Sequence, residues 1–148
     1  KINSIDNVFR NFFHHGNTKD ECYPSLNIEP DSSSLSIDMS LYNNKSEDIH
    51  QHIDFEEIDL KKWTHFAILL NNDNLTLYVN GDKRLDQKLD GELQWPCIRR
   101  RKKVYISSPW NANNHNYSLS DFIWIPHIIS EPLIHHHYMR SCPQKICF

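Results

Sequence analysis

Apolar and polar residues alternate along much of the chain. In residues 34–42, SLSIDMSLY, every second residue from Leu35 to Leu41 is apolar, and the residues between them are serine or aspartate. Residues 75–79, LTLYV, repeat this alternation. Successive side chains of a β-strand point to opposite faces of its sheet, so both segments are predicted to be strands that bury one face.

Other segments extend this pattern of strands and turns. HFAILL, residues 65–70, is apolar on both faces, which is typical of a central strand covered on each side. After LTLYV, Asn80 and Gly81 supply the small residues with positive φ that a tight turn needs. Further strands are predicted at VFRNFF, VYIS and DFIWI, separated by the turn-forming clusters HHGN, EPDSSS, NNDN, LDGE and NANNHN. A short helix is predicted at ISEPLIHHHYM, and the spacing of strands and turns favours an all-β sandwich.

Length and composition narrow the class of protein. With 148 residues, of which 39% are hydrophobic and 11% aromatic, the chain is predicted to form one domain around one core. Its net charge of -3 gives no overall electrostatic reason to bind nucleic acid or an anionic membrane. No apolar run approaches the roughly 18 residues of a membrane span, so membrane insertion is not expected.

The chain has four cysteines, an even number that permits three complete pairings: Cys22, Cys97, Cys142 and Cys147. Disulfide bonds are predicted, with buried free thiols and metal ligation as alternatives; the spacing C-x2-C, typical of metal sites, is absent from the sequence. Cys22 and Cys97 fall in loops that a sandwich can bring together, and a bond between them would stabilise by roughly 4 kcal/mol. Cys142 and Cys147 follow the last predicted strand, where they either close a small loop or pair with a flanking region.

The predicted hairpin resembles one in a known family. WTHFA at residues 63–67, followed by LYVNG at residues 77–81, is similar to the hairpin of laminin-G-like and pentraxin-like modules, which are concanavalin A-like jelly rolls. Four other segments resemble stretches of this family in the same order: FRNFFHHGN, LNIEPDSSSLSIDMS, VYISSPW and YSLSDFIWIP. The strand that usually precedes FRNFF in these modules has little room in this chain.

The resemblance implies a fold and a set of structural positions. The expected fold is an all-β, two-sheet antiparallel jelly-roll sandwich over residues 1–133, followed by a C-terminal extension, residues 134–148, that contains histidine and cysteine. The positions that match the family's motifs are expected to be structural: Trp63, His65, Tyr78, Asn80, Gly81 and Trp110. Trp63 is expected to close one end of the sandwich, and His65 to lie at the edge of the core.

Some jelly rolls of this superfamily are glycoside hydrolases, and the segment FEEIDLKK invites the comparison. Glu57 and Asp59 would project from one face of a strand, but the next position on that face is Lys61. Glycoside hydrolysis needs two carboxyl groups, and a lysine cannot act as a carboxylic acid with a raised pKa. We therefore expect no enzymatic activity, and interpret this segment as a charged loop.

No cofactor is expected, although Ca2+ stays a candidate. His135, His136 and His137 are adjacent and therefore point in divergent directions, so they are interpreted as solvated surface. Many modules of this superfamily hold Ca2+ with carboxylates at the rim of the sandwich, and the resemblance makes three aspartates candidates: Asp73, Asp82 and Asp121. These three are scattered through turns, where aspartate is common without a metal.

A dense run of positive charge precedes the VYIS strand: Arg99, Arg100, Arg101, Lys102 and Lys103. Burying a charge without a partner is costly, so the run is predicted to be an exposed loop or strand edge. Two other interpretations stay open, a protease-sensitive site and a surface that binds a sulfated glycan or an acidic protein. Binding of sulfated glycans is also found among the laminin-G-like modules that the chain resembles.

Two hypotheses for the function follow. The first is a non-catalytic adhesion or recognition module of a larger secreted or cell-surface protein, whose loops NNDN, NANNHN and HHGN offer amides to a glycan or a protein partner. The second is a purely structural domain that packs against other domains of the same polypeptide. Nucleic acid is not an expected partner.

Overall fold

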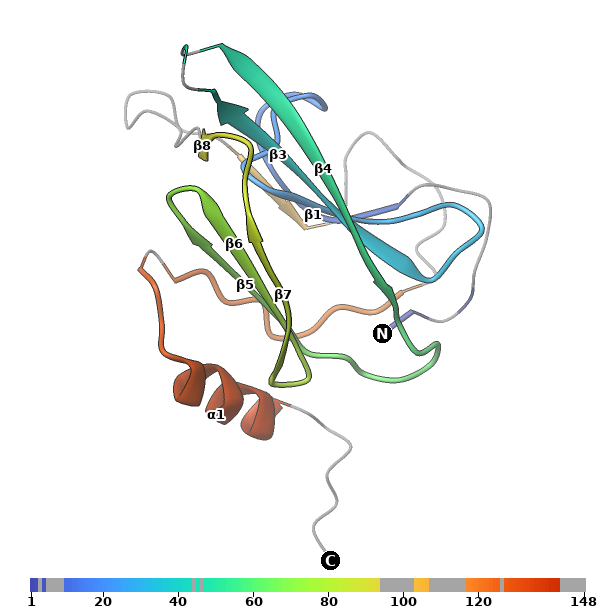
Figure 1. Cartoon of the computed structure of the whole chain (residues 1–148). Helices are drawn as coiled ribbons and strands as arrows, with labels where there is room; N and C mark the ends of the chain where they lie inside the picture. Colours follow the sequence, from blue (N-terminus) through green and yellow to red (C-terminus); the bar gives the residue numbers. More distant parts are fainter. Residues whose placement is uncertain are drawn as a thin grey trace, which may run out of the picture.

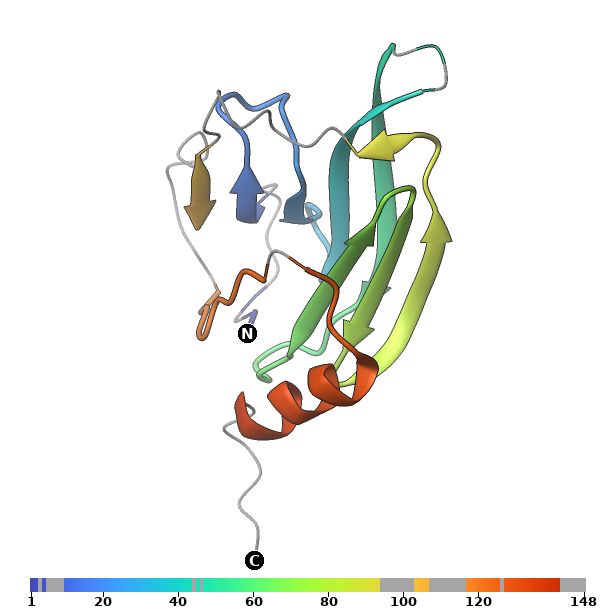
Figure 2. The ribbon, with the colours of Figure 1, turned by 90° about the vertical axis from the view of Figure 1, so that its left-hand side faces the viewer.

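In the computed structural model the chain folds into a sandwich of two antiparallel sheets, as the sequence predicts (Figures 1 and 2). The structure describes residues 1–2, 4, 10–43, 45, 47–93, 103–106, 117–125 and 127–141. Within these residues the larger sheet has the strand order β4-β3-β2-β1-β9, with β8 paired to β3, and the smaller sheet has the order β5-β6-β7. The strands of the larger sheet are β1 (Arg10–His15), β2 (Ser25–Ile28), β3 (Ser34–Tyr42), β4 (Asp48–Glu57), β8 (Glu92–Leu93) and β9 (Val104–Ile106). Those of the smaller sheet are β5 (Phe66–Asn71), β6 (Asn74–Val79) and β7 (Asp82–Lys88).

The hydrophobic core lies between the two sheets. The alternating apolar residues of β3 are fully buried, and they belong to the same cluster as Leu75 and Leu77 of β6. Burying a side chain of this size stabilises the fold by roughly 1.5–3 kcal/mol. The period-two pattern of the sequence therefore predicts correctly which face of each strand points into the core.

HFAILL forms strand β5, but the prediction that this strand is a central one is wrong. Strand β5 is an edge of the smaller sheet, where β6 is its paired neighbour among the described residues, and its apolar side chains are partly buried. The segment DFIWI, predicted as a strand, is irregular, so it gives β5 no second neighbour. Its Phe122 ring instead stacks on Phe13 of β1, with ring centroids 5.1 Å apart. Aromatic packing against β1 thus takes the place of strand pairing.

The first residues of the chain also reach this segment. Ile2 forms an isolated antiparallel bridge with Tyr117, and the amino group of Lys1 donates a hydrogen bond to the Ser118 carbonyl oxygen at 2.9 Å. Ile2 is buried, and Tyr117 packs edge-on against Phe12 at 4.4 Å. The modules that the chain resembles usually have a full first strand here, whereas this chain forms a short bridge.

The turn between β6 and β7 follows the sequence prediction. Asn80 and Gly81 both have left-handed backbone angles, with φ of 53° and 86°, as a tight turn between twisted strands requires. Asn80 also connects this turn to the start of β5. Its side-chain Oδ1 accepts a hydrogen bond from the backbone amide of His65 at 3.0 Å, and its backbone amide donates to the His65 carbonyl oxygen at 2.9 Å.

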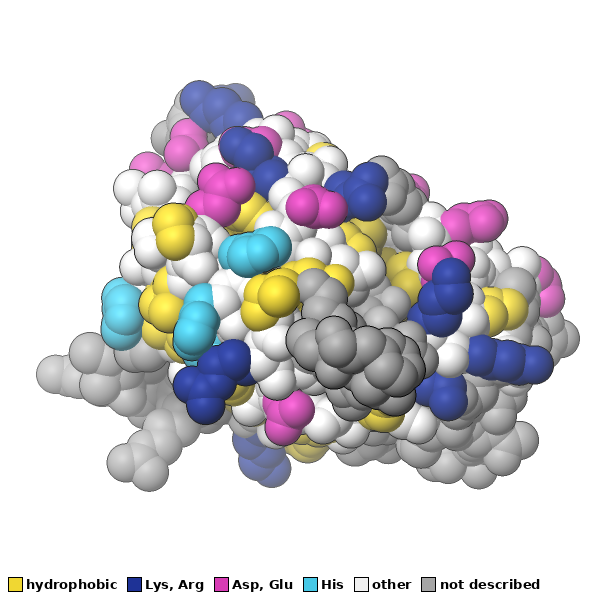
Figure 3. All heavy atoms as spheres, turned by 90° about the horizontal axis from the view of Figure 1, so that it is seen from below, with side chains coloured by type: hydrophobic (Ala, Val, Ile, Leu, Met, Phe, Trp, Pro, Cys, Tyr) yellow, Lys and Arg dark blue, Asp and Glu magenta, His cyan; other side chains and the backbone are white. Residues whose placement is uncertain are grey.

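The predicted helix is confirmed as α1 (Glu131–Ser141), which lies below the smaller sheet in Figure 1. It buries Ile134, and its Tyr138 ring lies 5.8 Å from the ring of His65. The expected boundary between residues 133 and 134 falls inside this helix. Seen from below, the histidine side chains gather beside hydrophobic ones on the side of α1, while charges of both signs are mixed across the rest of this view (Figure 3). Among the described residues, no helix combines the length and the apolar composition that crossing a membrane would take.

Candidate functional site

Polar side chains cover the face of the larger sheet that is turned away from the core. In β3 they alternate with the buried apolar residues, so they necessarily point to the opposite face. The strand register places them in two neighbouring rows: His14, Ser25, Asp38 and His52 in one, and Asn11, Asn27, Ser36 and Asp54 in the other. We call these eight residues the outer polar face.

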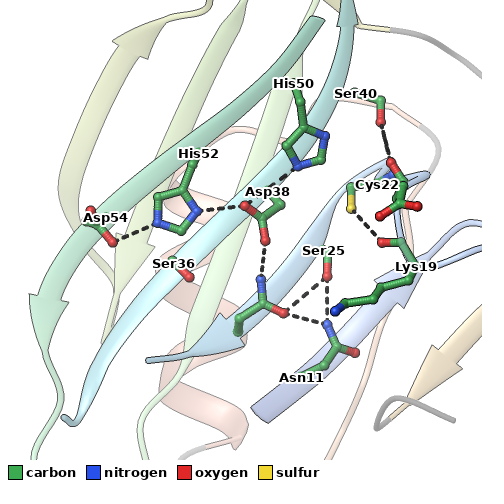
Figure 4. A network of polar contacts seen from close by, with 12 residues as sticks. Asn11, Lys19, Cys22, Ser25, Ser36, Asp38, Ser40, His50, His52 and Asp54 are labelled. Atoms are coloured by element: carbon green, nitrogen blue, oxygen red, sulfur yellow. Dashed lines mark hydrogen bonds and ion pairs between the residues drawn. The ribbon is translucent and has the colours of Figure 1, made fainter. Parts of the chain in front are cut away.

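A continuous chain of hydrogen bonds links the outer polar face across four strands (Figure 4). Asn11 Nδ2 donates to Asn27 Oδ1 at 2.7 Å, and Asn27 Nδ2 donates to Asp38 Oδ2 at 2.7 Å. The other oxygen of Asp38 lies 2.7 Å from His52 Nδ1. On the far side of the ring, His52 Nε2 lies 3.0 Å from Asp54 Oδ1. Each side chain therefore fixes the orientation of the next.

The imidazole of His52 lies between two carboxylates. Its hydrogen bond to Asp38 is the main cause that raises the pKa of His52 above its ordinary value. Partial burial lowers this pKa, and the hydrogen bond to Asp54 raises it. A carboxylate can only accept a hydrogen bond, so the protonated ring, which donates from both nitrogens, satisfies both contacts. His50, two residues away on the same face of β4, lies 3.8 Å from Asp38.

From Asn27 outward, burial falls steadily along this chain of hydrogen bonds. Asn27 is 1% exposed, whereas the side chains of Asp38, His52 and Asp54 are 17%, 45% and 71% exposed. The buried amide thus anchors a set of groups whose far end meets solvent. A ligand can reach His52 and Asp54 directly, and their positions are set from within the sheet.

Glu29 joins the exposed end of the outer polar face. It follows β2, and its carboxylate accepts a hydrogen bond from the Ser36 hydroxyl. Glu29, His52 and Asp54 each offer one metal-ligand atom, and these three atoms lie within 4.8 Å of one another. Sequence reasoning missed this group. The available signal is DIHQHID, residues 48–54, whose alternation places two histidines and two aspartates on one face of a strand.

The basic run falls mostly outside the described residues, which include Lys103 but not Arg99, Arg100, Arg101 or Lys102. Lys103 is exposed and precedes β9. Its amide donates to Asn17 Oδ1 at 3.2 Å, and its carbonyl oxygen accepts from the Gly16 amide at 2.9 Å. Lys103, the last residue of the run, therefore lies beside the turn that follows β1, and the binding role of the run stays a prediction.

Cys22 differs from the sequence-based expectation, because in the structure it is a buried free thiol instead of half of a disulfide bond. The Ser40 amide of β3 donates to the Cys22 carbonyl oxygen, and the Cys22 amide donates to the Ser40 hydroxyl, so this segment is held against the sheet. The thiol lies 3.6 Å from the Lys19 carbonyl oxygen. Burial is the main cause that raises the pKa of Cys22 to about 12. Cys97, Cys142 and Cys147 lie outside the described residues.

The described residues of the family motif lie around the end of the smaller sheet. Tyr78 is buried, Trp63 and His65 are half-buried, and Trp110 lies outside the described residues. Burial is the main cause that lowers the pKa of His65, and the charge of His137 acts in the same direction. His65, Asn80 and Gly81 link β5, the turn after β6 and α1, and the outer polar face is formed by other strands.

The other candidate carboxylates lie apart from this face. Asp73 forms an ion pair with Lys88 at 3.4 Å, and Asp59 forms one with Lys62 at 2.8 Å. Glu57 is the last residue of β4, while Asp82 and Asp121 lie exposed elsewhere in the chain. None of these residues joins Glu29, His52 and Asp54.

The comparison with family models agrees with this architecture. A laminin G-like family model, described as the concanavalin A-like lectin/glucanases superfamily, matches residues 1–121. The chain therefore belongs to this superfamily, as a laminin G-like module. A comparison with curated proteins gave no match. Among solved structures, the chain is similar to residues 221–444 of an S-layer domain-containing protein from Clostridium thermocellum ATCC 27405, with 15% identity and a TM-score of 0.39. That similarity covers 93% of this chain and 65% of the other.

Proposed function

We propose that this module recognises a glycan, without catalysis, as part of a larger secreted or cell-surface protein. The observation that carries the proposal is the hydrogen-bonded chain of the outer polar face, which runs from the buried Asn27 to the exposed His52 and Asp54. Carboxylate and imidazole groups pair well with sugar hydroxyls, which both donate and accept hydrogen bonds. Lectins are named in the description of the superfamily, which supports this choice of ligand.

An exposed aromatic ring completes the proposed binding surface. Tyr42 lies on the same face of β3 as Asp38, and it is 45% exposed. The register pairs Tyr42 with Asp48, two positions along β4 from His50 and four from His52. Ligand sites typically combine an apolar or aromatic surface with a few oriented polar groups. Tyr42 would supply the first and the exposed end of the outer polar face the second.

The rigid support of this surface favours specific binding. Each polar group is held by a neighbour before any ligand arrives, so little side-chain entropy is lost on binding. A hydrogen bond to a charged group contributes about 1.5–3 kcal/mol, and removing one such contact weakens binding roughly tenfold or more.

Hydrolysis is the less favoured use of the same face. Carboxylate oxygens of Glu29 and Asp54 lie within 4.8 Å, near the separation of about 5 Å between the two carboxyl groups of retaining glycosidases. The acid of such a pair needs an environment that keeps it protonated, usually an apolar pocket. Asp54 is instead 71% exposed and hydrogen-bonded to His52. This environment supports binding over bond cleavage.

The test is a glycan array probed with the purified chain, followed by affinity measurements on the glycans that bind. Tyr42→Ala and His52→Ala are each expected to weaken binding about tenfold or more. His127→Ala is the matched control, because His127 is an exposed histidine that does not belong to the outer polar face. Absence of binding to every glycan, or equal binding by all variants, would refute the proposal. Release of shorter sugars from a bound glycan would instead support a hydrolase.

The basic run adds a proposal about the class of glycan. Five cations at residues 99–103 would attract sulfate groups, and such binding weakens steeply with added salt. Retention on immobilised heparin that salt reverses, and that is lost when Arg99, Arg100 and Arg101 are replaced by alanine, would support a sulfated ligand. Binding that survives these substitutions would assign recognition to the outer polar face alone.

A second function, packing against another domain, is supported by a different observation. Several large apolar side chains are between 43% and 60% exposed: Val104, Ile106, Leu119, Phe122, Ile123, Trp124 and Ile128. Exposed apolar surface of this kind is uncommon on isolated soluble domains and often marks an interface. When a neighbouring domain of the same polypeptide is expressed together with this one, it should then protect residues 119–125 from amide hydrogen exchange. A negative glycan array would make this function the preferred one.

A further inference from the structure

We propose that Glu29, His52 and Asp54 form a binding site for a divalent transition-metal ion, with Zn2+ as the best fit. The ligands would be one carboxylate oxygen of Glu29, one of Asp54, and Nε2 of His52. This inference does not rest on the proposed function, because a metal ion can bind here whether or not a glycan does.

The spacing of the three side chains suits a single ion. Their ligand atoms lie within 4.8 Å of one another, and His52 Nε2 lies 3.0 Å from Asp54 Oδ1. Two zinc ligands at about 2.1 Å that meet at a tetrahedral angle are about 3.4 Å apart. Rotation of the Asp54 and Glu29 side chains would bring the three ligand atoms to that distance. The metal would replace the proton between Nε2 and Asp54, which is released to solvent.

The second observation concerns the other nitrogen of His52. Metal-binding histidines usually donate their remaining ring N–H to a carboxylate, which fixes the tautomer and the direction of the ring. Here Asp38 lies 2.7 Å from His52 Nδ1, and Asp38 is itself held by Asn27, which is 1% exposed. This arrangement leaves Nε2 directed toward Asp54 and the solvent. It distinguishes the trio from acidic side chains that merely lie close together on a surface.

Glu29 is also held in place. The Ser36 hydroxyl, which is buried, donates a hydrogen bond to one of its carboxylate oxygens, so the carboxylate is oriented by the sheet. Three carboxylates, those of Glu29, Asp38 and Asp54, surround one imidazole. A dication at this position offsets their mutual repulsion, which favours a metal ion over a neutral ligand.

The ligand types select among metals. Ca2+ prefers six to eight oxygen ligands, and Mg2+ prefers oxygen in octahedral geometry, whereas Zn2+ binds nitrogen and carboxylate oxygen together. Three protein ligands leave at least one coordination position open, as in zinc sites that bind water or substrate. That position faces solvent here, because Asp54 and His52 are the exposed end of the outer polar face.

The test is a titration of the chelator-treated, untagged chain with ZnCl2, followed by calorimetry and by NMR of the histidine ring nitrogens. Each histidine gives its own ring signals, so the method separates His52 from the histidines of α1, which could also bind zinc. We expect the His52 Nε2 signal to shift and to saturate, and Ca2+ to leave it unchanged. Zinc-induced shifts confined to His135, His136 and His137, or none at all, would overturn the proposal.

Variants sharpen this test. Asp54→Asn changes an exposed side chain and should keep the fold, yet it should abolish the His52 shift. Asp38→Asn removes the orienting carboxylate and is expected to weaken zinc binding about 10- to 100-fold. His50→Ala is the matched control, since His50 lies on the same face of β4 outside the trio, and it should bind as the parent does. Equal affinity in Asp54→Asn and His50→Ala would also overturn the proposal. Glycan binding measured with chelator present stays independent of these outcomes.

Discussion

Gly81 lies directly against helix α1, where a β-carbon on this residue would stand 2.8 Å from Nδ1 of His135 and 2.9 Å from Cδ1 of Tyr138. The family motif places a glycine here, and its positive φ already favours glycine in the turn. The contact with α1 adds a second reason, because any larger residue would push against the helix. One position thus shapes both the β6–β7 turn and the packing of the C-terminal helix.

Gly81→Ala is therefore expected to lower the free energy of unfolding by roughly 1–3 kcal/mol, from backbone strain at positive φ together with the crowding of His135. Asp82→Ala, at the exposed next position of the same turn, is the control and should change stability by less than about 0.5 kcal/mol. Denaturant unfolding measures both. Equal stability of the two variants would show that α1 does not pack on Gly81.

His65 is expected to contribute stability that is lost as the pH falls below about 6.5, opposite in sign to the contribution of His52, whose pKa is raised. Burial lowers the pKa of His65 in the folded state, so the unfolded chain binds a proton first as the pH falls. The contribution is complete above the pKa of the unfolded chain, about 6.5, and decreases below it. Among the described residues, Nδ1 of His65 has no hydrogen-bond partner that would support the charged ring.

His65→Gln removes this titration. The loss of stability between about pH 7.5 and pH 5.5 should then be smaller in the variant than in the parent, as measured by denaturant unfolding at each pH. His14, whose pKa is also lowered chiefly by burial, is present in both chains, so its contribution cancels in the comparison. An identical pH dependence in both proteins would contradict the role assigned to His65.

The thiol of Cys22 is expected to resist alkylation in the folded protein. It is 4% exposed and its pKa is raised to about 12, so at neutral pH it is both inaccessible and protonated. Iodoacetamide treatment followed by peptide mass mapping should modify Cys22 only after denaturation. Rapid modification of the native protein would contradict the buried thiol, and recovery of Cys22 in a disulfide-linked peptide would restore the bond to Cys97 that the sequence favours.

Substitutions at two isoleucines test how much the core and the irregular segment 121–125 each contribute to stability. Ile37 is fully buried, whereas Ile123 is 60% exposed. Ile37→Ala is expected to destabilise by about 2–5 kcal/mol, and Ile123→Ala by less than about 1 kcal/mol. Thermal or denaturant unfolding of both variants makes the comparison. A large effect at Ile123 would show that this segment packs into the sandwich as the closing strand that the sequence predicts.

The elements that the sequence predicts best are those in which local pattern and final burial agree. The period of two in SLSIDMSLY and LTLYV defines the inward faces of β3 and β6, and the pair Asn80 and Gly81 defines the turn that follows. The predictions for HFAILL and DFIWI are wrong because an apolar segment does not specify which neighbour covers it. In this chain DFIWI packs its rings on β1, and β5 is left at the edge of its sheet.

By itself, the sequence determined the all-β class, the inward faces of the main strands and the short C-terminal helix, because these follow from side-chain periodicity and turn chemistry within a few residues. Tertiary structure alone decided the outer polar face. Glu29, Asp38 and His52 come from separate parts of the chain, and the antiparallel register of β2, β3 and β4 brings them together. When read along the chain, Asp38 and His52 are ordinary polar residues of half-buried strands, and Glu29 is an ordinary residue after a strand. Strand pairing sets their distances, and no local pattern encodes which strands pair.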